Sequence, residues 1–308
     1  MHPANPNTFA NSPLDRAGHL RAKPEELARL RKSAAASLVL VRDGRPFVGA
    51  CKGSEPAKIA WLNPAFLAAH AAGATEIFLG LDDKGPVFAA DVSSLADPQE
   101  GGPLQGLGEF QDLRSLLPLL SPSDAAIIGQ AKSLLDWHAR HGFCAKCGAP
   151  TRLAQGGYRR DCGVCKAEHF PRTDPVAIML AVCGDEILLG RGAQWPPKRY
   201  SALAGFIEPG ETIEEGAARE LFEEAGVKAL SVRYLFSQPW PFPSSLMIGC
   251  VAQVENRNFK LDPEELADAR WFPRAELPSL LNGMHADGCA GPPPFAIAHQ
   301  LIRAWIEP

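Results

Sequence analysis

Seven glutamates fall within the 23 residues from Gly205 to Val227. Hard divalent cations such as Mg²⁺ and Mn²⁺ take oxygen ligands, and Mg²⁺ sites usually combine a few carboxylates with substrate phosphates. This density of carboxylates therefore predicts a metal-dependent site for a phosphate compound. Glu220, Glu223 and Glu224 stand at i, i+3 and i+4, so on a helix they project from neighbouring points of one face. A solvated acidic helix is the alternative for such a run taken alone.

The same segment carries the signals of a helix over about 213–225. Thr212 and Glu215 have the spacing of a capping box, and Gly226 can end the helix. Apolar residues recur every four positions as a stripe to be buried: Ile213, Ala217 and Leu221. One face of this helix is thus predicted to be apolar, while a different face presents the carboxylates.

The stretch resembles the Nudix hydrolase signature G-x5-E-x7-R-E-U-x-E-E-x-G-U, where U is aliphatic, at every fixed position. Those positions hold Gly205, Glu211, Arg219, Glu220, Leu221, Glu223, Glu224, Gly226 and Val227. The resemblance implies a loop-helix-loop on an α/β/α sandwich that hydrolyses a nucleoside diphosphate linked to another group. By position, Glu220 and Glu224 would bind Mg²⁺ or Mn²⁺ and Glu223 would be a further ligand or the base. Arg219 would orient a carboxylate, with Glu211 as the candidate.

Four cysteines form a second constellation, in which two Cys-x-x-Cys pairs are separated by fourteen residues: Cys144, Cys147, Cys162 and Cys165. Two such knuckles predict a zinc ribbon, because each short loop directs two thiolates at one tetrahedral ion. Two disulfides are the alternative, but they need an oxidising compartment. With four thiolates on one Zn²⁺ per chain no coordination position stays open, so we expect a structural site.

Zinc ribbons can also bind nucleic acid, and this is the rival function for the segment. One aromatic residue and three cations stand near the second knuckle: Tyr158, Arg159, Arg160 and Lys166. This is less than the basic, aromatic-rich surface typical of a nucleic-acid binder. We therefore favour the structural interpretation.

A proline-rich segment with two large rings follows the strand-like run 230–236. Three prolines make it stiff and extended, which suits a rim for a flat aromatic ligand, while a rigid loop with its rings in the core is the alternative. The pattern S-Q-P-W-P-F-P-x-S resembles the motif of the NADH pyrophosphatase branch of the Nudix family. The candidate substrate-binding residues here are Gln238, Pro239, Trp240, Pro241, Phe242, Pro243, Ser244 and Ser245.

Further site residues are implied by the resemblance alone. Phe170, Phe206 and Ala298 match family positions near the substrate. Ala204 would offer its carbonyl to the metal, and Glu265 matches a later metal ligand. For Glu265 the alternative is one more surface glutamate at the start of a helix.

Strand-like and helical runs suggest three parts. Apolar runs at 37–41 and 76–80 predict strands, 123–141 predicts a helix leading to the ribbon, and the nearly continuous apolar run 176–182 suits a central strand paired with 186–190. We predict an α/β (α+β) chain, and the family resemblance implies a degenerate Nudix-like N-terminal domain at 1–140. A zinc ribbon at 141–170 and a catalytic Nudix α/β/α sandwich at 171–308 would follow.

Composition agrees with a two-core globular chain. The 308 residues are 46% hydrophobic and 21% charged, and the net charge of −4 argues against a dedicated nucleic-acid scaffold. The first residues lack the pattern of a signal peptide, and no apolar run approaches a membrane span, so we expect a cytoplasmic protein without a membrane partner. Four further cysteines are interpreted as reduced core residues: Cys51, Cys183, Cys250 and Cys289.

Together these features predict metal-assisted hydrolysis of the diphosphate bond of NADH, and of NAD⁺, to AMP and the (reduced) nicotinamide mononucleotide. Removal of 5′ NAD caps from RNA by the same chemistry is an alternative, and a broader dinucleotide or ADP-ribose pyrophosphatase is another. The non-enzyme alternative is a nucleotide-binding sensor, against which the complete set of signature carboxylates speaks. The resemblance also suggests a homodimer.

Overall fold

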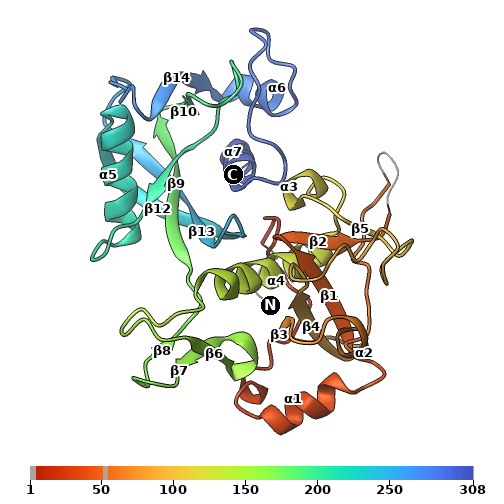
Figure 1. Cartoon of the computed structure of the whole chain (residues 1–308). Coiled ribbons are helices and arrows are strands. Elements are labelled where there is room, and N and C mark those ends of the chain that lie inside the picture. Colours follow the sequence, from red (N-terminus) through yellow and green to blue (C-terminus); the bar gives the residue numbers. More distant parts are fainter. Residues whose placement is uncertain (1–4, 51–54, 308) are drawn as a thin grey trace. The chain divides into compact units, whose positions relative to one another are not determined.

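The computed structural model describes residues 5–50 and 55–307, which form two compact units (Figure 1). The N-terminal unit comprises residues 11–172 and 241–244, and the C-terminal unit comprises residues 5–10, 173–240 and 245–307. The ribbon segment thus shares a unit with the residues before it, and the first described residues belong with the C-terminal part of the chain. The division into 1–140, 141–170 and 171–308 stays a prediction, because a compact unit need not coincide with one domain.

A mixed sheet is the frame of the C-terminal unit. Its strand order is β12-β13-β9-β10-β14, with β11 paired to β9, and only the β9–β13 pair is parallel. The strands are β9 (Asp174–Cys183), β10 (Glu186–Gly192), β11 (Leu203–Phe206), β12 (Ala229–Trp240), β13 (Ser245–Val254) and β14 (Leu266–Pro273). The predicted central strand is therefore confirmed as β9, and its predicted partner as β10.

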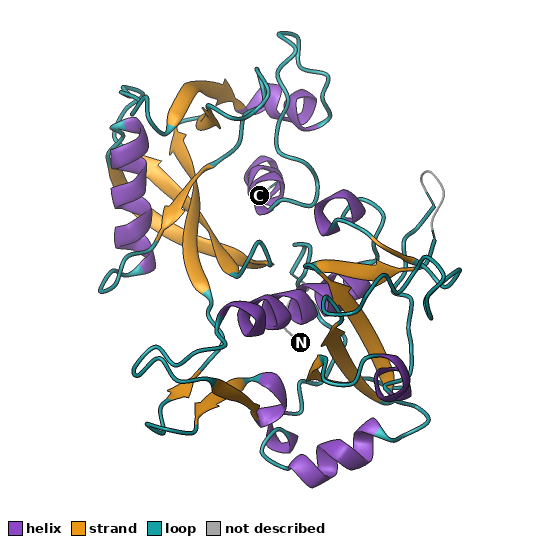
Figure 2. Cartoon of the chain, in the orientation of Figure 1, coloured by secondary structure: helices purple, strands orange, loops and turns teal. Residues whose placement is uncertain are grey.

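Helices cover both faces of this sheet (Figures 1 and 2). One face packs on α5 (Ile213–Ala225), and the other packs on α6 (Leu277–Leu281) and α7 (Ile297–Ile306). Side chains alternate along β9, so Ala177, Met179 and Ala181 join the core under α5. Ile178, Leu180 and Val182 join the core under α6 and α7. The predicted α/β/α sandwich is confirmed, and the two-sided burial explains why β9 is apolar at nearly every position.

The helix α5 has the limits that its sequence predicts. The Thr212 side chain accepts a hydrogen bond from the Glu215 backbone amide, and the Glu215 carboxylate accepts one from the Thr212 amide, which completes a capping box. Gly226 ends the helix in the left-handed conformation with φ of 65°. Ala217 and Leu221 are fully buried. The apolar stripe therefore fixes which face of α5 points away from the sheet.

A five-stranded sheet, ordered β3-β4-β1-β2-β5, forms the centre of the N-terminal unit. Its strands are β1 (Ser37–Arg42), β2 (Arg45–Val48), β3 (Thr75–Leu81), β4 (Pro86–Asp91) and β5 (Glu109–Phe110). Its helices are α1 (Pro24–Arg31), α2 (Ala65–His70), α3 (Leu113–Leu116) and α4 (Pro122–Arg140), with a short 3₁₀ turn η1 (Gly18–Leu20). The predicted strands at 37–41 and 76–80 and the predicted helix at 123–141 are confirmed. Among the described residues no helix has the length and apolarity to cross a membrane.

The zinc-ribbon segment forms a small three-stranded sheet ordered β6-β7-β8. It consists of β6 (Thr151–Ala154), the 3₁₀ turn η2 (Gln155–Gly157), β7 (Arg159–Cys162) and β8 (Glu168–His169). The C-terminal unit has one further 3₁₀ turn, η3 (Arg274–Glu276). With so few residues, the ribbon has little apolar core of its own.

The ribbon is joined to the rest of the N-terminal unit through η2. His138 of α4 contacts the Gly157 carbonyl through Nε2 at 2.8 Å, and its Nδ1 lies 2.9 Å from the Arg160 guanidinium. Because an arginine donates only, Nδ1 accepts and Nε2 carries the proton. Burial is the main cause that lowers the pKa of His138 to about 4, and the charges of Arg160 and His141 add to it. The ring is therefore neutral. His138 is thus a buried residue that packs near the end of α4 and lies outside the cluster of four cysteines.

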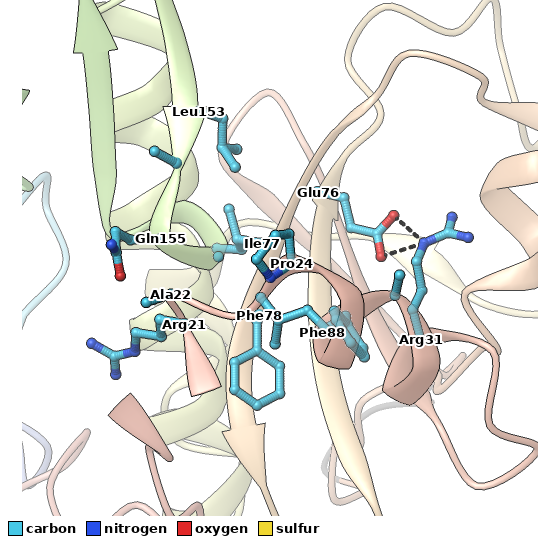
Figure 3. A pocket seen from close by; sticks show the side chains of 14 residues that line it. Arg21, Ala22, Pro24, Arg31, Glu76, Ile77, Phe78, Phe88, Leu153 and Gln155 are labelled. Atoms are coloured by element: carbon cyan, nitrogen blue, oxygen red, sulfur yellow. Dashed lines mark hydrogen bonds and ion pairs between the residues drawn. The ribbon is translucent and has the colours of Figure 1, made fainter. Parts of the chain in front are cut away.

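A cavity of about 480 Å³ lies beside this junction (Figure 3). Its walls come from α1, β3, β4 and the ribbon, and they include Arg21, Ile77, Phe78 and Gln155. Arg31 and Glu76 face each other at 2.8 Å at one end. Burial of Glu76 raises its pKa, while the ion pair with Arg31 opposes that effect.

We expect Gly157→Ala to destabilise the N-terminal unit by about 2 to 4 kcal/mol, the sum of backbone strain and overpacking. Gly157 has φ of 100°, and a methyl group there would lie 2.4 Å from Ile77 Cγ2. Gly163→Ala is the matched control in the same ribbon, because nothing lies within 4 Å of its added Cβ. Thermal unfolding of both variants checks this, and equal melting temperatures would contradict the close approach.

Candidate active site and metal centre

The C-terminal unit has a cavity of about 490 Å³ that the acidic helix faces. Three of its carboxylates come from two elements: Glu220 and Glu224 from α5, and Glu265 from the turn before β14. Glu208 and Ala204 also line it. Four of the residues predicted to hold the metal thus line one cavity, whereas Glu223, predicted as a further ligand or the base, does not line it and accepts a hydrogen bond from Arg219. Glu265 is exposed and precedes the strand β14, not a helix, and its role as a metal ligand stays a prediction.

Gly205, the first residue of the signature, lines this cavity and has no side chain. A Cβ added to Gly205 would lie 1.9 Å from Cδ of Glu220. The carboxyl group of Glu220 therefore fills the space that any side chain at position 205 would need. This close approach of β11 and α5 gives a steric reason for glycine at that position.

Arg219 holds the loop and the helix together through several contacts. Its Nε and Nη2 donate to the two oxygens of Glu211 at 2.6 and 2.9 Å. Its Nη1 donates to Glu220 at 2.9 Å and to Glu223 at 3.0 Å, and its Nη2 also donates to the Phe206 carbonyl at 2.8 Å. The bond from Arg219, followed by one from the Glu208 backbone amide, lowers the pKa of Glu211 to about 2. The expected contact between Arg219 and Glu211 is thus present, and Arg219 orients carboxylates.

The electrostatics of the carboxylates fit a divalent cation. Burial, followed by the charges of Glu265 and Glu220, raises the pKa of Glu224 to about 8. Burial also raises the pKa of Glu220, against the effect of Arg219. The charges of Glu220 and Glu265 beside the buried Glu224 favour its protonation unless a cation balances them. The oxygen-rich donor set is the type that Mg²⁺ and Mn²⁺ bind.

The residues predicted to contact substrate fall into different places. Phe206 lines the cavity, and 59% of its surface is exposed. Phe170 is 62% exposed and belongs to the N-terminal unit. Ala298 is 1% exposed, in the core under α7. The Ala298 side chain packs among apolar residues and does not line the cavity, and its predicted place near the substrate stays a prediction.

The proline-rich segment forms a hairpin and not an isolated rim. β12 continues through Gln238 and Pro239 to Trp240, which pairs with Ser245 of β13, and the turn is Pro241, Phe242, Pro243 and Ser244. Trp240 meets the ring of Phe9 edge-on at 6.2 Å between centroids. Phe242 lies under the Arg114 guanidinium at 4.2 Å. None of the described residues from 237 to 245 lines the carboxylate cavity.

Gln238 is a fully buried structural residue. Its amide nitrogen donates to the Phe295 carbonyl at 2.8 Å and to the Thr8 carbonyl at 3.2 Å, and its oxygen accepts from the Ile297 amide at 2.9 Å. These partners fix the start of α7 and the N-terminal residues. The polar atoms of Gln238 are thus used inside the unit, and its predicted contact with substrate stays a prediction.

The four predicted zinc ligands form one cluster. Their sulfur atoms all lie within 4.8 Å of one another, and the pairs Cys144–Cys165 and Cys147–Cys162 are 3.5 Å apart. Zn–S bonds of about 2.3 Å place the sulfurs of a tetrahedral site about 3.8 Å apart, so the cluster fits zinc. The cysteines are free thiols, as are Cys183, Cys250 and Cys289, while Cys51 lies outside the described residues. The structure thus agrees with a structural zinc ribbon.

His169 is a neighbour of this cluster that sequence reasoning missed. Its Nε2 lies 3.3 Å from the sulfur of Cys144. A ring N–H at this position would donate to the thiolate and orient it, as residues around metal ligands commonly do. The available signal was a histidine four residues after Cys165, at the end of the ribbon.

The fold and the site define an α/β/α protein with a carboxylate-lined cavity and a separate four-cysteine metal cluster. Residues 172–289 match the NUDIX domain, residues 35–137 match the NADH pyrophosphatase-like rudimentary NUDIX domain, and residues 139–170 match the NADH pyrophosphatase zinc ribbon domain.

Three relatives are similar over much of the chain. The NAD-capped RNA hydrolase NudC of Stutzerimonas stutzeri (strain A1501) is 39% identical over 74% of this chain and 76% of its own length. The human NAD(P)H pyrophosphatase NUDT13, mitochondrial, is 39% identical over 74% of this chain and 66% of its own length. The human NAD-capped RNA hydrolase NUDT12 is 46% identical over 61% of this chain, but the match spans only 43% of that protein. The chain belongs to the Nudix hydrolase family, in its NADH pyrophosphatase branch.

Proposed function

We propose that this chain hydrolyses the diphosphate bond of NADH and NAD⁺ to AMP and the (reduced) nicotinamide mononucleotide. The observation that carries the proposal is one cavity of about 490 Å³ that combines Glu220, Glu224 and Glu265 with the exposed ring of Phe206. Carboxylates that need a cation suit a diphosphate, and an exposed ring suits a base. The relative NUDT13 is named for hydrolysis of NAD(P)H.

In the proposed mechanism, the residues of the site bind the metal, accept a proton or position other side chains. Glu220, Glu224, Glu265 and the Ala204 carbonyl would hold Mg²⁺ or Mn²⁺, whose Lewis acidity would supply charge neutralisation for the diphosphate and activation of water. Glu223 or Glu224 would take the proton as the water oxygen attacks phosphorus and the bridging P–O bond breaks. Arg219 and Glu211 would hold these carboxylates in place, and a ring would hold a base. The zinc would be structural.

Removal of 5′ NAD caps from RNA is the second candidate, because NUDT12 and NudC are both named as NAD-capped RNA hydrolases. The bond that would break is the same. A broader ADP-ribose hydrolase and a non-catalytic sensor are the remaining alternatives. We also propose, from the family resemblance, a homodimer, and from the sequence a cytoplasmic location.

Chromatography of the products decides among these candidates. We expect purified protein with Mg²⁺ or Mn²⁺ to convert NADH to AMP and reduced mononucleotide faster than it cleaves ADP-ribose or a short NAD-capped RNA. A faster reaction with the capped RNA would support decapping, and a faster reaction with ADP-ribose would support the broader hydrolase. Binding of NADH without cleavage under either metal would support the sensor.

A further inference from the structure

A second large ring lines the carboxylate cavity besides Phe206. Trp195 lies in the connection between β10 and β11, and 44% of its surface is exposed. Its backbone amide donates to the Gly192 carbonyl at 3.1 Å, which closes a turn. A Cβ added to Gly192 would lie 3.8 Å from Nε1 and 3.9 Å from Cδ1 of the indole. The ring therefore lies beside bare backbone at the cavity wall.

The connection that carries Trp195 is held firmly. Pro196 and Pro197 follow it and restrict the backbone. The Lys198 ammonium donates to the Asp287 carbonyl at 2.6 Å, and the Ala290 amide donates to the Lys198 carbonyl at 2.9 Å. Little conformational freedom would be lost when a ligand meets this ring.

The place of the ring, and not its exposure alone, points to a ligand. Trp61 is 40% exposed but does not line the cavity of Glu220, Glu224 and Glu265, so partial exposure of a tryptophan does not by itself indicate this site. Trp195 shares its cavity with Glu220, Glu224 and Glu265 and with the ring of Phe206. A dinucleotide has one base on each side of its diphosphate. The cavity supplies the same kinds of partner, with carboxylates that suit a metal-bound diphosphate and two exposed rings that suit bases.

We infer that Trp195 is a substrate-binding residue whose indole stacks on one base of the dinucleotide, while Phe206 serves the other base. This inference rests on the proposed function. Stacking on an aromatic side chain tolerates any base, because every base has a π-face. Trp195 would therefore set the affinity for the substrate and leave the chemistry at phosphorus to the carboxylates.

Steady-state kinetics with two substrates tests the role of Trp195. We expect Trp195→Ala to raise KM for NADH by about 5- to 150-fold, the value of one stacked base, with kcat little changed. Trp195→Phe should restore most of the affinity, and Trp61→Ala, the matched control, should leave KM unchanged. A KM for ADP-ribose that rises in parallel assigns the ring to adenine. A KM for ADP-ribose that stays unchanged assigns it to nicotinamide.

Trp195→Leu covers the case in which the alanine variant unfolds, since leucine keeps apolar contact with Gly192 but has no ring. Equal KM values for wild type and the leucine variant, at equal melting temperatures, overturn the inference.

Calorimetric titration of NAD⁺ without added divalent metal separates the two proposals. If wild type cleaves nothing but binds NAD⁺, and the leucine variant binds at least 5-fold more weakly, only the proposed function fails. If wild type cleaves NADH and the variant binds NAD⁺ equally well, only the stacking role fails.

Discussion

Glu224→Gln is expected to lower kcat for NADH hydrolysis by about 10²- to 10⁴-fold, the range for loss of a group that handles the proton in the transition state. The substitution keeps the size of the side chain and removes its negative charge. Glu224 is buried and faces the cavity together with Glu220 and Glu265. Initial rates at saturating NADH over a series of Mg²⁺ and Mn²⁺ concentrations measure the effect, and Glu220→Gln should also lower kcat because it removes a proposed metal ligand.

The same variant should be at least as stable as wild type when no divalent metal is present. Burial and the charges of Glu265 and Glu220 raise the pKa of Glu224 to about 8, so the substitution relieves a repulsion only above that pH and is close to neutral below it. Glu214→Gln is the control, because Glu214 lies on the same helix, is exposed and lines no part of the cavity. Unchanged hydrolysis by Glu220→Gln and Glu224→Gln would refute the assignment of this site.

Removal of zinc is expected to unfold the ribbon, since structural zinc contributes about 10 kcal/mol or more to the folding of small zinc domains. Cys162→Ser or a strong chelator should reduce the zinc content from one ion per chain and raise hydrogen exchange throughout β6, β7 and β8. Because η2 packs on Ile77 and His138, the melting temperature of the N-terminal unit should fall as well. Elemental analysis and hydrogen exchange by mass spectrometry measure both effects.

Cys183→Ser is the control for the zinc experiment, since Cys183 is a free cysteine outside the cluster. It should keep both the zinc content and the exchange pattern. A metal-free protein with the same exchange in 151–169 as the zinc form would show that the ribbon folds without the ion. That result would remove the structural role proposed for zinc.

Local features of the chain are predictable from sequence because their causes are local. The limits and the buried face of α5 follow from three local features. These are the capping box at Thr212, the glycine at 226 and the apolar residues at every fourth position. β9 is recognisable because burial on both faces leaves a nearly continuous apolar run. The cysteine cluster follows from two short loops, each of which aims two sulfurs at one point.

The rest of the site depends on contacts between residues far apart in the chain. Gln238 matches a family position near the substrate, and its side-chain amide forms hydrogen bonds with the backbone of residues 8, 295 and 297. No local pattern of the sequence predicts that these residues lie together. Ala298 matches another such position, but the packing of α7 buries it. Trp195 carries no pattern that marks it, and only the approach of its turn to β11 and α5 places it in the cavity.

The sequence by itself determined the family signature, the helix that carries it, the central strand and the ligands of the ribbon. These depend on spacing along the chain, where backbone geometry converts residue intervals directly into positions in space. Tertiary structure alone decided which side chains share the carboxylate cavity, which signature-like residues are buried, and how Gly157 seats the ribbon against Ile77. Those outcomes follow from close packing between distant segments, where a difference of one methyl group decides whether two backbones can meet.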